Sequence, residues 1–144
     1  MSIVIGVDPD SKKHGIAIYK DGKLDDLLMM SLPEIVDDLF QTESLGHALW
    51  AIEDVNTNKF VYGRNQHASK AAQSKIAMGV GKCQQAQTEI VRMLDHYGID
   101  YKLIKPQRGN WAKNKAQFEK VTGWTGRSNE DTRSAAYFGW LALK

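Results

Sequence analysis

The segment 3-IVIGVDPDSKKHGIAIY-19 decides the fold of this chain. Its five-residue apolar run, rich in β-branched side chains, predicts a strand that is buried on both faces. Asp8 ends that run, turn-forming residues follow at 9–11, and residues 15–19 predict a second strand. A carboxylate at the end of a buried strand is costly to desolvate unless a cation lies beside it. Open α/β sheets bind their ligands at the carboxyl ends of the strands, which is where Asp8 lies. Asp8 is therefore a candidate for a metal or phosphate site, and a simple turn-capping role is the alternative.

The remaining segments predict alternating strands and helices. Further strands are expected at 24–32, 48–52 and 101–104, and helices at 33–46, 68–97, 114–121 and from 128 onward. The first three strands are expected to form an antiparallel meander, and a strand–helix–strand link makes the fourth strand parallel to the first. The predicted fold class is therefore α/β, with a five-stranded mixed sheet flanked by helices, in one domain spanning 1–144.

The long helix carries two features that need an interpretation. Gly79 and Gly81 are expected to bend it or split it in two. Cys83 falls on its apolar face, which favours a buried small side chain over a nucleophile. A single cysteine excludes an internal disulfide and favours a reducing compartment. With no signal-peptide pattern and no run of membrane-spanning length, we expect a cytoplasmic protein.

Acidic residues recur at two further element ends. Glu53 directly follows the strand at 48–52, so Asp8 and Glu53 are expected at the same sheet edge if these strands are neighbours. Glu130 and Asp131 fall in the first turn of the last helix, with Ser128 as the expected N-cap and Asp131 as the third residue of a capping box. The helix dipole alone also accounts for acids at that position.

Charge is divided unevenly along the chain. Residues 1–55 hold 4 Lys/Arg and 11 Asp/Glu, whereas residues 56–144 hold 15 and 6. This asymmetry favours a surface that meets a polyanion, with solvation of exposed helix faces as the alternative. Basic residues interleaved with Trp111 and Trp124 predict a surface that grips a nucleic-acid backbone. Phe60 and Tyr62 are predicted either to stack on unpaired bases or to fold back as a hydrophobic plug.

Taken together, these motifs resemble those of the RuvC-like Holliday-junction resolvases of the RNase H-like superfamily, and are similar to its bacteriophage members. The matching segments are IVIGVDPDSKKHGIAIY, WAIEDV, SKIAMGVGKCQQAQTEI and NEDTRSAA, in the family's order and spacing. The resemblance implies an RNase H-like fold and a metal-dependent endonuclease that resolves four-way junctions and other branched DNA by phosphodiester hydrolysis. Because paired nicks need two active sites related by symmetry, it also implies a homodimer, with the long helix as the expected interface.

The resemblance also implies a metal site. Two Mg²⁺ ions, with Mn²⁺ as a substitute, would lie roughly 4 Å apart, bridged by Asp8, with Glu53 on one of them and Asp131 completing the cluster. The family's usual second Asp, three residues after Asp131, is Ser134 here, which is a poor Mg²⁺ ligand. Glu130 is the candidate to compensate. The alternatives are a catalytically weakened junction-binding protein and an RNA-processing nuclease of the same fold.

Candidate DNA contacts complete the predicted site. Lys113, Lys115 and Lys120 correspond loosely to the region where the family carries lysines that contact phosphate. The further basic and aromatic candidates are Arg108, Arg64, Lys70, Lys75, Phe60 and Tyr62.

Overall fold

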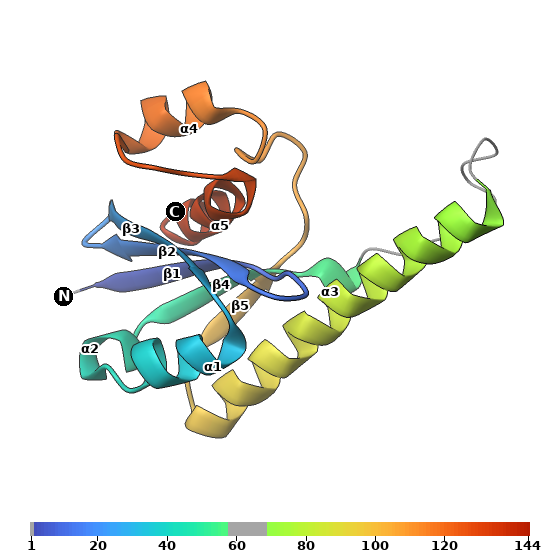
Figure 1. The fold of residues 1–144 in the computed structure, drawn as a ribbon. Helices are drawn as coiled ribbons and strands as arrows, with labels where there is room; N and C mark the ends of the chain where they lie inside the picture. The colour runs from blue at the N-terminus through green and yellow to red at the C-terminus, as the bar shows by residue number, and fades with distance from the viewer. Residues whose placement is uncertain (1, 58–68) are drawn as a thin grey trace.

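The computed structural model describes residues 2–57 and 69–144 and places helices on both faces of a central sheet (Figure 1). The strands are β1 (Ile3–Asp8), β2 (His14–Lys20), β3 (Lys23–Met30), β4 (Leu49–Glu53) and β5 (Tyr101–Ile104). Their order is β3-β2-β1-β4-β5, in which β2 is antiparallel to both β1 and β3, and β4 is parallel to both β1 and β5. The predicted mixed sheet of five strands is confirmed, although the third strand begins and ends earlier than expected.

The helices differ more from the expectation. They are α1 (Leu32–Glu34), the π-helix η1 (Ile35–Phe40), α2 (Glu43–Gly46), the 3₁₀-helix η2 (Val55–Thr57), α3 (Lys70–Tyr97), α4 (Lys115–Thr122) and α5 (Glu130–Ala142). The single helix predicted at 33–46 is thus three short pieces. Ser31 and Glu34 form the capping box that starts it. Ile35, Leu39 and Phe40 are the buried residues of η1, and their spacing of four and five suits a turn wider than an α-helical one.

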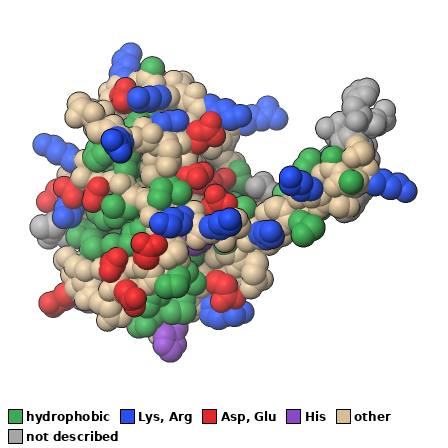
Figure 2. Space-filling model, in the orientation of Figure 1, with side chains coloured by type: hydrophobic (Ala, Val, Ile, Leu, Met, Phe, Trp, Pro, Cys, Tyr) green, Lys and Arg blue, Asp and Glu red, His purple; other side chains and the backbone are tan. Residues whose placement is uncertain are grey.

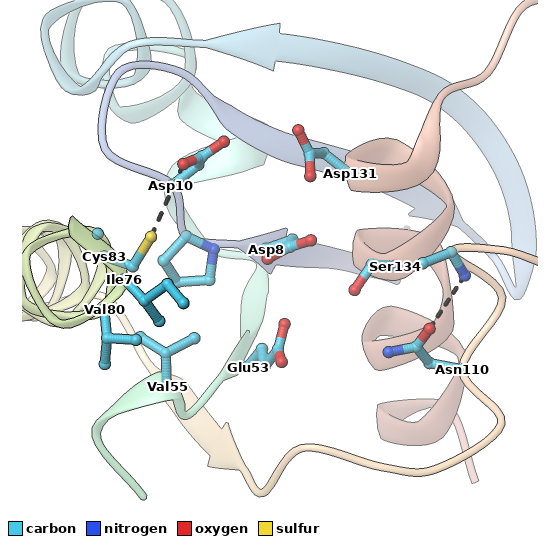
Figure 3. Close-up of a pocket in the computed structure, with 13 residues that line it drawn as sticks. Asp8, Asp10, Glu53, Val55, Ile76, Val80, Cys83, Asn110, Asp131 and Ser134 are labelled. Carbon is cyan, nitrogen blue, oxygen red and sulfur yellow. Dashed lines mark hydrogen bonds between the residues drawn. The ribbon is translucent and has the colours of Figure 1, made fainter. Parts of the chain in front are cut away.

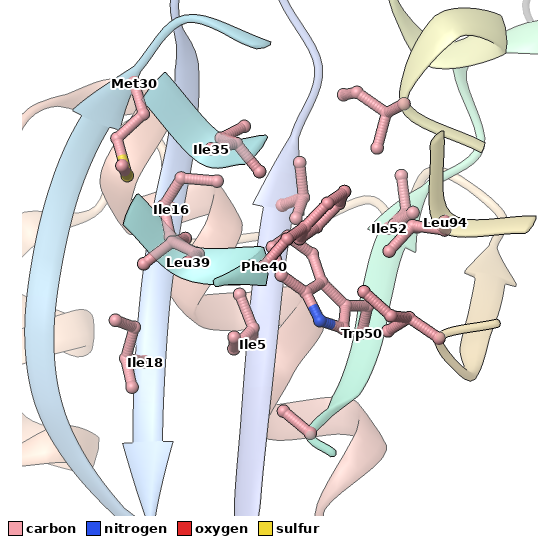
Figure 4. Close-up of a cluster of buried hydrophobic side chains, with 14 of the residues drawn as sticks. Ile5, Ile16, Ile18, Met30, Ile35, Leu39, Phe40, Trp50, Ile52 and Leu94 are labelled. Atoms are coloured by element: carbon pink, nitrogen blue, oxygen red, sulfur yellow. The ribbon is translucent and has the colours of Figure 1, made fainter. Parts of the chain in front are cut away.

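One hydrophobic core lies between the sheet and the side that carries η1 and α3. Alternate residues of β1 face it, because side chains along a strand point to opposite faces in turn. Trp50 of β4 is fully buried and meets the ring of Phe40 edge-on, with 5.3 Å between centroids (Figure 4). Leu94 of α3 and Ile35 of η1 close this core from the helix side. The alternate residues of β1 that remain, including Asp8, therefore face the opposite side of the sheet.

The second core lies on that opposite side, under α5 and α4. Trp111 is only 3% exposed and packs against Phe118 of α4, so its predicted place on a DNA-gripping surface is wrong. Trp124 packs against the same core and is partly buried. The tryptophans of this basic segment thus pack into the core between α4 and α5, whereas its lysines and arginines stay exposed.

The long helix α3 is continuous through Gly79 and Gly81, so the predicted bend or break is wrong. It begins at the N-cap Ser69 and ends at Gly98, whose left-handed backbone conformation (φ 67°) closes the last turn. Gln87, Ile90 and Leu94 bury its C-terminal half against the sheet. Its N-terminal half extends beyond the body of the molecule (Figure 1) and exposes Met78.

Candidate active site

The parallel pairing of β1 and β4 brings two acids together. The register sets Gly6 beside Ala51 and Val7 beside Ile52, so that the next residues, Asp8 and Glu53, leave the two strands side by side. Both side chains lie on the face covered by α5, because each is one residue beyond a side chain that points into the opposite core. The sequence-based expectation that these two acids share a sheet edge is confirmed.

Helix α5 adds a third acid, and two glycines let it approach. A Cβ added at Gly15 would overlap the backbone carbonyl of Asp131, and one added at Gly6 would overlap that of Ala135. Since Gly15 is the register partner of Asp8, the first turn of α5 rests directly on the strand ends. The absence of side chains at Gly6 and Gly15 thus allows α5 to approach closely enough to bring Asp131 to the sheet edge that carries Asp8.

These acids line one pocket of about 450 Å³. In Figure 3, Asp8 lies at the centre, with Glu53 below it and with Asp10 and Asp131 on either side above it. The remaining wall is largely apolar, with Ile76 and Val80 of α3, Val55 and Ala112, and it also contains two polar side chains, those of Cys83 and Asn110. An acidic floor beside an apolar wall is a setting in which carboxylates are poorly solvated.

Burial and mutual repulsion shift the protonation of these acids. Burial, then the charge and hydrogen bond of Glu53 and the charge of Asp131, raise the pKa of Asp8 to about 9. Burial also raises the pKa of Glu53, and burial with the charges of Asp10 and Glu130 raises that of Asp131. In the described ranges, no Lys, Arg or His forms an ion pair with Asp8, Glu53 or Asp131. The pocket therefore concentrates negative charge that no described basic side chain compensates.

Oxygen donors without a basic partner fit a hard divalent cation. Carboxylates are the ligands that Mg²⁺ prefers, and an ion there would offset the repulsion that raises these pKa values. In residues 2–57 and 69–144, however, no three Asp, Glu, His or Cys side chains are already arranged as ligands of one ion. An ion would thus have to draw Asp131 toward the hydrogen-bonded pair of Asp8 and Glu53.

Ser134 lies one helical turn after Asp131 and lines the same pocket. It is only 3% exposed, and the nearby Ser134 hydroxyl lowers the pKa of the Asp8 carboxyl, against the stronger effects of burial and neighbouring acids that raise it. Ser134 therefore favours the charged form of Asp8 without supplying a charge of its own.

Glu130 does not take the role suggested for it. Its side chain is exposed and is absent from the pocket lining, because one residue along an α-helix turns the side chain by about 100°. The cap of α5 also differs from the prediction. Asn129, not Ser128, is the N-cap, and it exchanges hydrogen bonds with Thr132, which leaves Asp131 as the second residue of the helix.

Cys83 is not buried on the apolar face as predicted. It is partly exposed at the pocket wall, where its thiol donates to Oδ1 of Asp10 at 3.7 Å. Burial and the negative charges of Asp10 and Asp8 raise the thiol pKa, so it stays neutral. The raised pKa agrees with an unreactive thiol, although the thiol of Cys83 contacts a carboxylate and not an apolar face.

Two residues that the sequence did not single out hold the site in place. Gln87 of α3 is buried, donates to Oδ1 of Asp54 at 3.0 Å and accepts from the backbone N–H of Asn56 at 3.2 Å, which fixes the chain just after Glu53. A polar residue within the apolar stripe of α3 was its only signal. Arg133 donates twice to the carbonyl of Ala112, at 3.1 and 2.8 Å, and ties that loop to α5.

The basic candidates are exposed, and none of those that the structure describes lines the pocket. Lys113, Lys115, Lys120 and Arg108 are exposed on the loop before α4 and on α4 itself, and Lys70 and Lys75 are exposed on the projecting half of α3. Figure 2 shows Lys and Arg side chains along that half of α3 and over the part of the body that holds α4. The predictions for Arg64, Phe60 and Tyr62 lie outside the described residues.

The sheet order and its two helical layers define an α/β fold of the RNase H-like type. Among solved structures, the chain is similar to a Thermus thermophilus RuvC in complex with a Holliday junction substrate, with a TM-score of 0.61, 13% identity, and coverage of 96% of this chain and 90% of that one. A second Thermus thermophilus RuvC structure gives a TM-score of 0.50 at 14% identity, covering 96% and 91%. The fold is therefore RuvC-like, as the sequence motifs suggested.

Comparisons of the sequence itself add no relative. No protein-family model matches the chain, and no curated protein matches it either. In the described part of the chain, no helix has the length and apolar character needed to cross a membrane.

Proposed function

We propose that this chain is a divalent-metal-dependent endonuclease that hydrolyses phosphodiesters in branched DNA, with residues 1–144 as a single nuclease domain. One observation carries the proposal: acids from three separate elements, Asp8, Glu53 and Asp131, converge on one pocket at the carboxyl end of the β1–β4 pair. Structural acids are rarely gathered this way, because each raises the cost of ionising the next.

Branched DNA is the substrate class supported by the fold and by charge. One RuvC with the same fold is in complex with a Holliday junction substrate. In this chain, exposed basic residues flank the acidic pocket on two sides, on the loop before α4 and on α3. A phosphate backbone lying over both would place a phosphodiester at the acids, and its affinity would fall with salt as phosphate contacts are replaced by counterions.

The proposed roles follow from the position of each side chain. Asp8, Glu53 and Asp131 would hold Mg²⁺, or Mn²⁺ in its place, which when bound supplies an activated water and stabilises the leaving oxygen. The Ser134 hydroxyl would favour the ionised Asp8 carboxylate, the form that binds metal. The apolar side chains of α3 and η2 limit the access of bulk water to one side of the pocket. Lys113, which follows the pocket-lining Ala112 in the loop before α4, would contact a phosphate beside the reacting one.

A homodimer completes the proposal, because two cuts across a junction need two pockets related by symmetry. The projecting half of α3 is the proposed contact. It exposes Ile76 (49%) and Met78 (62%), which are large apolar side chains at positions where the described residues leave them uncovered.

The test is cleavage of a labelled four-way junction in Mg²⁺, with a linear duplex of the same sequence and an RNA hairpin as comparison substrates. We expect paired incisions in the junction that EDTA abolishes. Asp8→Asn should lower the rate by more than about a hundredfold while junction binding survives, since losing even a neighbour of a metal ligand costs about 10–100-fold. Cleavage of the RNA alone, or an Asp8→Asn variant that cuts at the parental rate, would contradict the proposal.

Ser134 supports a second candidate, which is junction binding without cutting. A hydroxyl in place of a carboxylate lowers the charge available to hold metal. If the parental chain binds junctions without nicking them and Ser134→Asp restores nicking, the binding-only function is correct.

A further inference from the structure

Asp10 lines the same pocket as the three proposed metal ligands, although its sequence pattern indicated only a turn. It lies on the loop between β1 and β2, so it approaches from the side opposite to Ser134. Figure 3 shows it above Asp8, between Cys83 of α3 and Asp131 of α5. The pocket therefore contains four acids, and the fourth comes from a different element than Ser134.

The carboxylate of Asp10 is held from one side only. Its Oδ1 accepts from the N–H of Ser11 at 2.6 Å and from the thiol of Cys83 at 3.7 Å. Within the described residues, neither a hydrogen bond to its Oδ2 nor an ion pair of Asp10 with a basic side chain is present. One oxygen is thus held by two donors, while the described residues give the other oxygen no hydrogen-bond partner.

The backbone of Asp10 is anchored as well. Its N–H donates to Nδ1 of His14 at 3.0 Å, and His14 is only 4% exposed. Burial lowers the pKa of His14 and so favours the neutral ring, and because Nδ1 accepts this bond, the ring proton lies on Nε2. A turn residue whose main chain and one carboxylate oxygen are both fixed is pre-organised to present its second oxygen.

We propose that Asp10 is a further ligand of the divalent metal centre, contributing the fourth carboxylate that Ser134 does not provide. This inference rests on the proposed function, because it assigns Asp10 to the metal held by Asp8, Glu53 and Asp131. A Mg²⁺ or Mn²⁺ ion takes about six oxygen ligands, so a fourth protein carboxylate fits its coordination. Because Asp10 lies on the turn beside α3, the fourth carboxylate of the proposed metal centre would come from the α3 side of the pocket and not from the next turn of α5.

The test measures metal binding without any substrate. Mn²⁺ is titrated into the full-length protein by calorimetry, and free Mn²⁺ is counted by electron paramagnetic resonance. Asp10→Asn keeps an oxygen that accepts from Ser11 and Cys83, so the turn should keep its conformation. We expect this variant to bind Mn²⁺ about tenfold or more weakly, or to bind one ion fewer.

Two variants separate ligation from simple charge. Glu130→Gln removes a charge next to Asp131 but outside the pocket lining, and it should weaken binding far less than Asp10→Asn. Asp10→Glu keeps the charge but displaces the carboxylate, and a ligand role predicts weakened binding there too. Equal effects of Asp10→Asn and Glu130→Gln, or full affinity in Asp10→Glu, would overturn the proposal.

The same titration distinguishes this inference from the function on which it depends. If the parental protein binds no Mn²⁺, or if Asp8→Asn binds it unchanged, the proposed metal centre itself fails. If Asp8→Asn abolishes binding while Asp10→Asn behaves like the parent, only the role of Asp10 fails. Circular dichroism of each variant confirms that it is folded, and Asp10→Glu decides the matter if Asp10→Asn does not fold.

Discussion

At the scale of single residues, the ionisation of Asp8 lowers the stability of the metal-free protein. Its folded-state pKa of about 9 lies far above its ordinary value of 3.8, chiefly because it is buried and lies beside Glu53. Between these two values the folded protein keeps a proton that the unfolded chain releases. The free energy of unfolding must therefore fall as pH rises through this range.

This gives a prediction for the metal-free protein. In EDTA, the stability of the parental chain should decrease from pH 5 to pH 9, by up to about 1.4 kcal/mol per pH unit. Asp8→Asn is neutral at every pH, so its stability should depend less on pH and exceed that of the parent at pH 8. Urea denaturation at several pH values measures both, with the exposed Asp37→Asn as a charge control. A parental stability that rises over this range would contradict the assignment.

Residue patterns in the sequence located part of the site in advance. Asp8 and Glu53 were predictable because each ends an apolar strand, and parallel neighbours carry such residues to the same edge. Asp10 and Cys83 were not predictable as neighbours, because they are 73 positions apart and only the path of α3 brings them together. Trp111 was misplaced since a tryptophan among lysines has the same local pattern whether it stacks on a base or fills a core.

At the scale of elements, the position of α5 depends on two strand positions that carry no side chain. Gly6 and Gly15 leave room for the carbonyls of Ala135 and Asp131, and the hydroxyl of Tyr19 donates to the carbonyl of Ala136 at 2.6 Å. The sequence predicted the strands that carry these glycines and the antiparallel meander of the first three strands, but nothing in it indicated which helix would lie on the glycines.

Gly15→Ala tests that contact. The added Cβ would meet backbone, which has no side chain to rotate away, so α5 must shift. We expect a loss of about 2 kcal/mol or more in the free energy of unfolding, together with weaker Mn²⁺ binding, since Asp131 moves with the helix.

Gly81→Ala is the matched control, because a Cβ there meets nothing within 4 Å and the residue is helical. It should stabilise the protein by about 0.5–1 kcal/mol. Equal stabilities of the two variants would contradict this account.

At the scale of the whole molecule, the uneven division of charge along the sequence has a counterpart around the pocket. Three acids of the first 55 residues, Asp8, Asp10 and Glu53, line the pocket together with Asp131, and exposed lysines of the later residues lie on α4, on the loop before it and on α3. Such an arrangement attracts a phosphate backbone while its acidic centre repels it until a cation is bound. DNA binding and metal binding are therefore expected to strengthen each other.

The salt dependence of junction binding tests the basic surroundings. Replacing both Lys113 and Lys115 by Gln should reduce the slope of log affinity against log salt by about 2, since each phosphate contact accounts for about 1. Lys23→Gln is the control, because the β2–β3 turn lies at the end of β1 opposite to Asp8. Fluorescence anisotropy of a labelled junction gives the slopes. An unchanged slope in the double variant would remove these lysines from the interface.

The projecting half of α3 gives the prediction with the widest consequence. A helix of 28 residues is about 42 Å long, and buried residues hold only its C-terminal half on the sheet. Met78 in the free half is 62% exposed, so a second copy packing there would cover apolar surface that the described body leaves in water.

Met78→Glu should therefore shift the protein from dimer to monomer in sedimentation velocity, whereas Thr88→Glu, at an exposed position of the anchored half, should not. Because each monomer holds one pocket, the Met78→Glu variant should still nick a junction but should lose the pairing of incisions. A parental chain that sediments as a monomer, or paired incisions by Met78→Glu, would exclude this surface as the dimer contact.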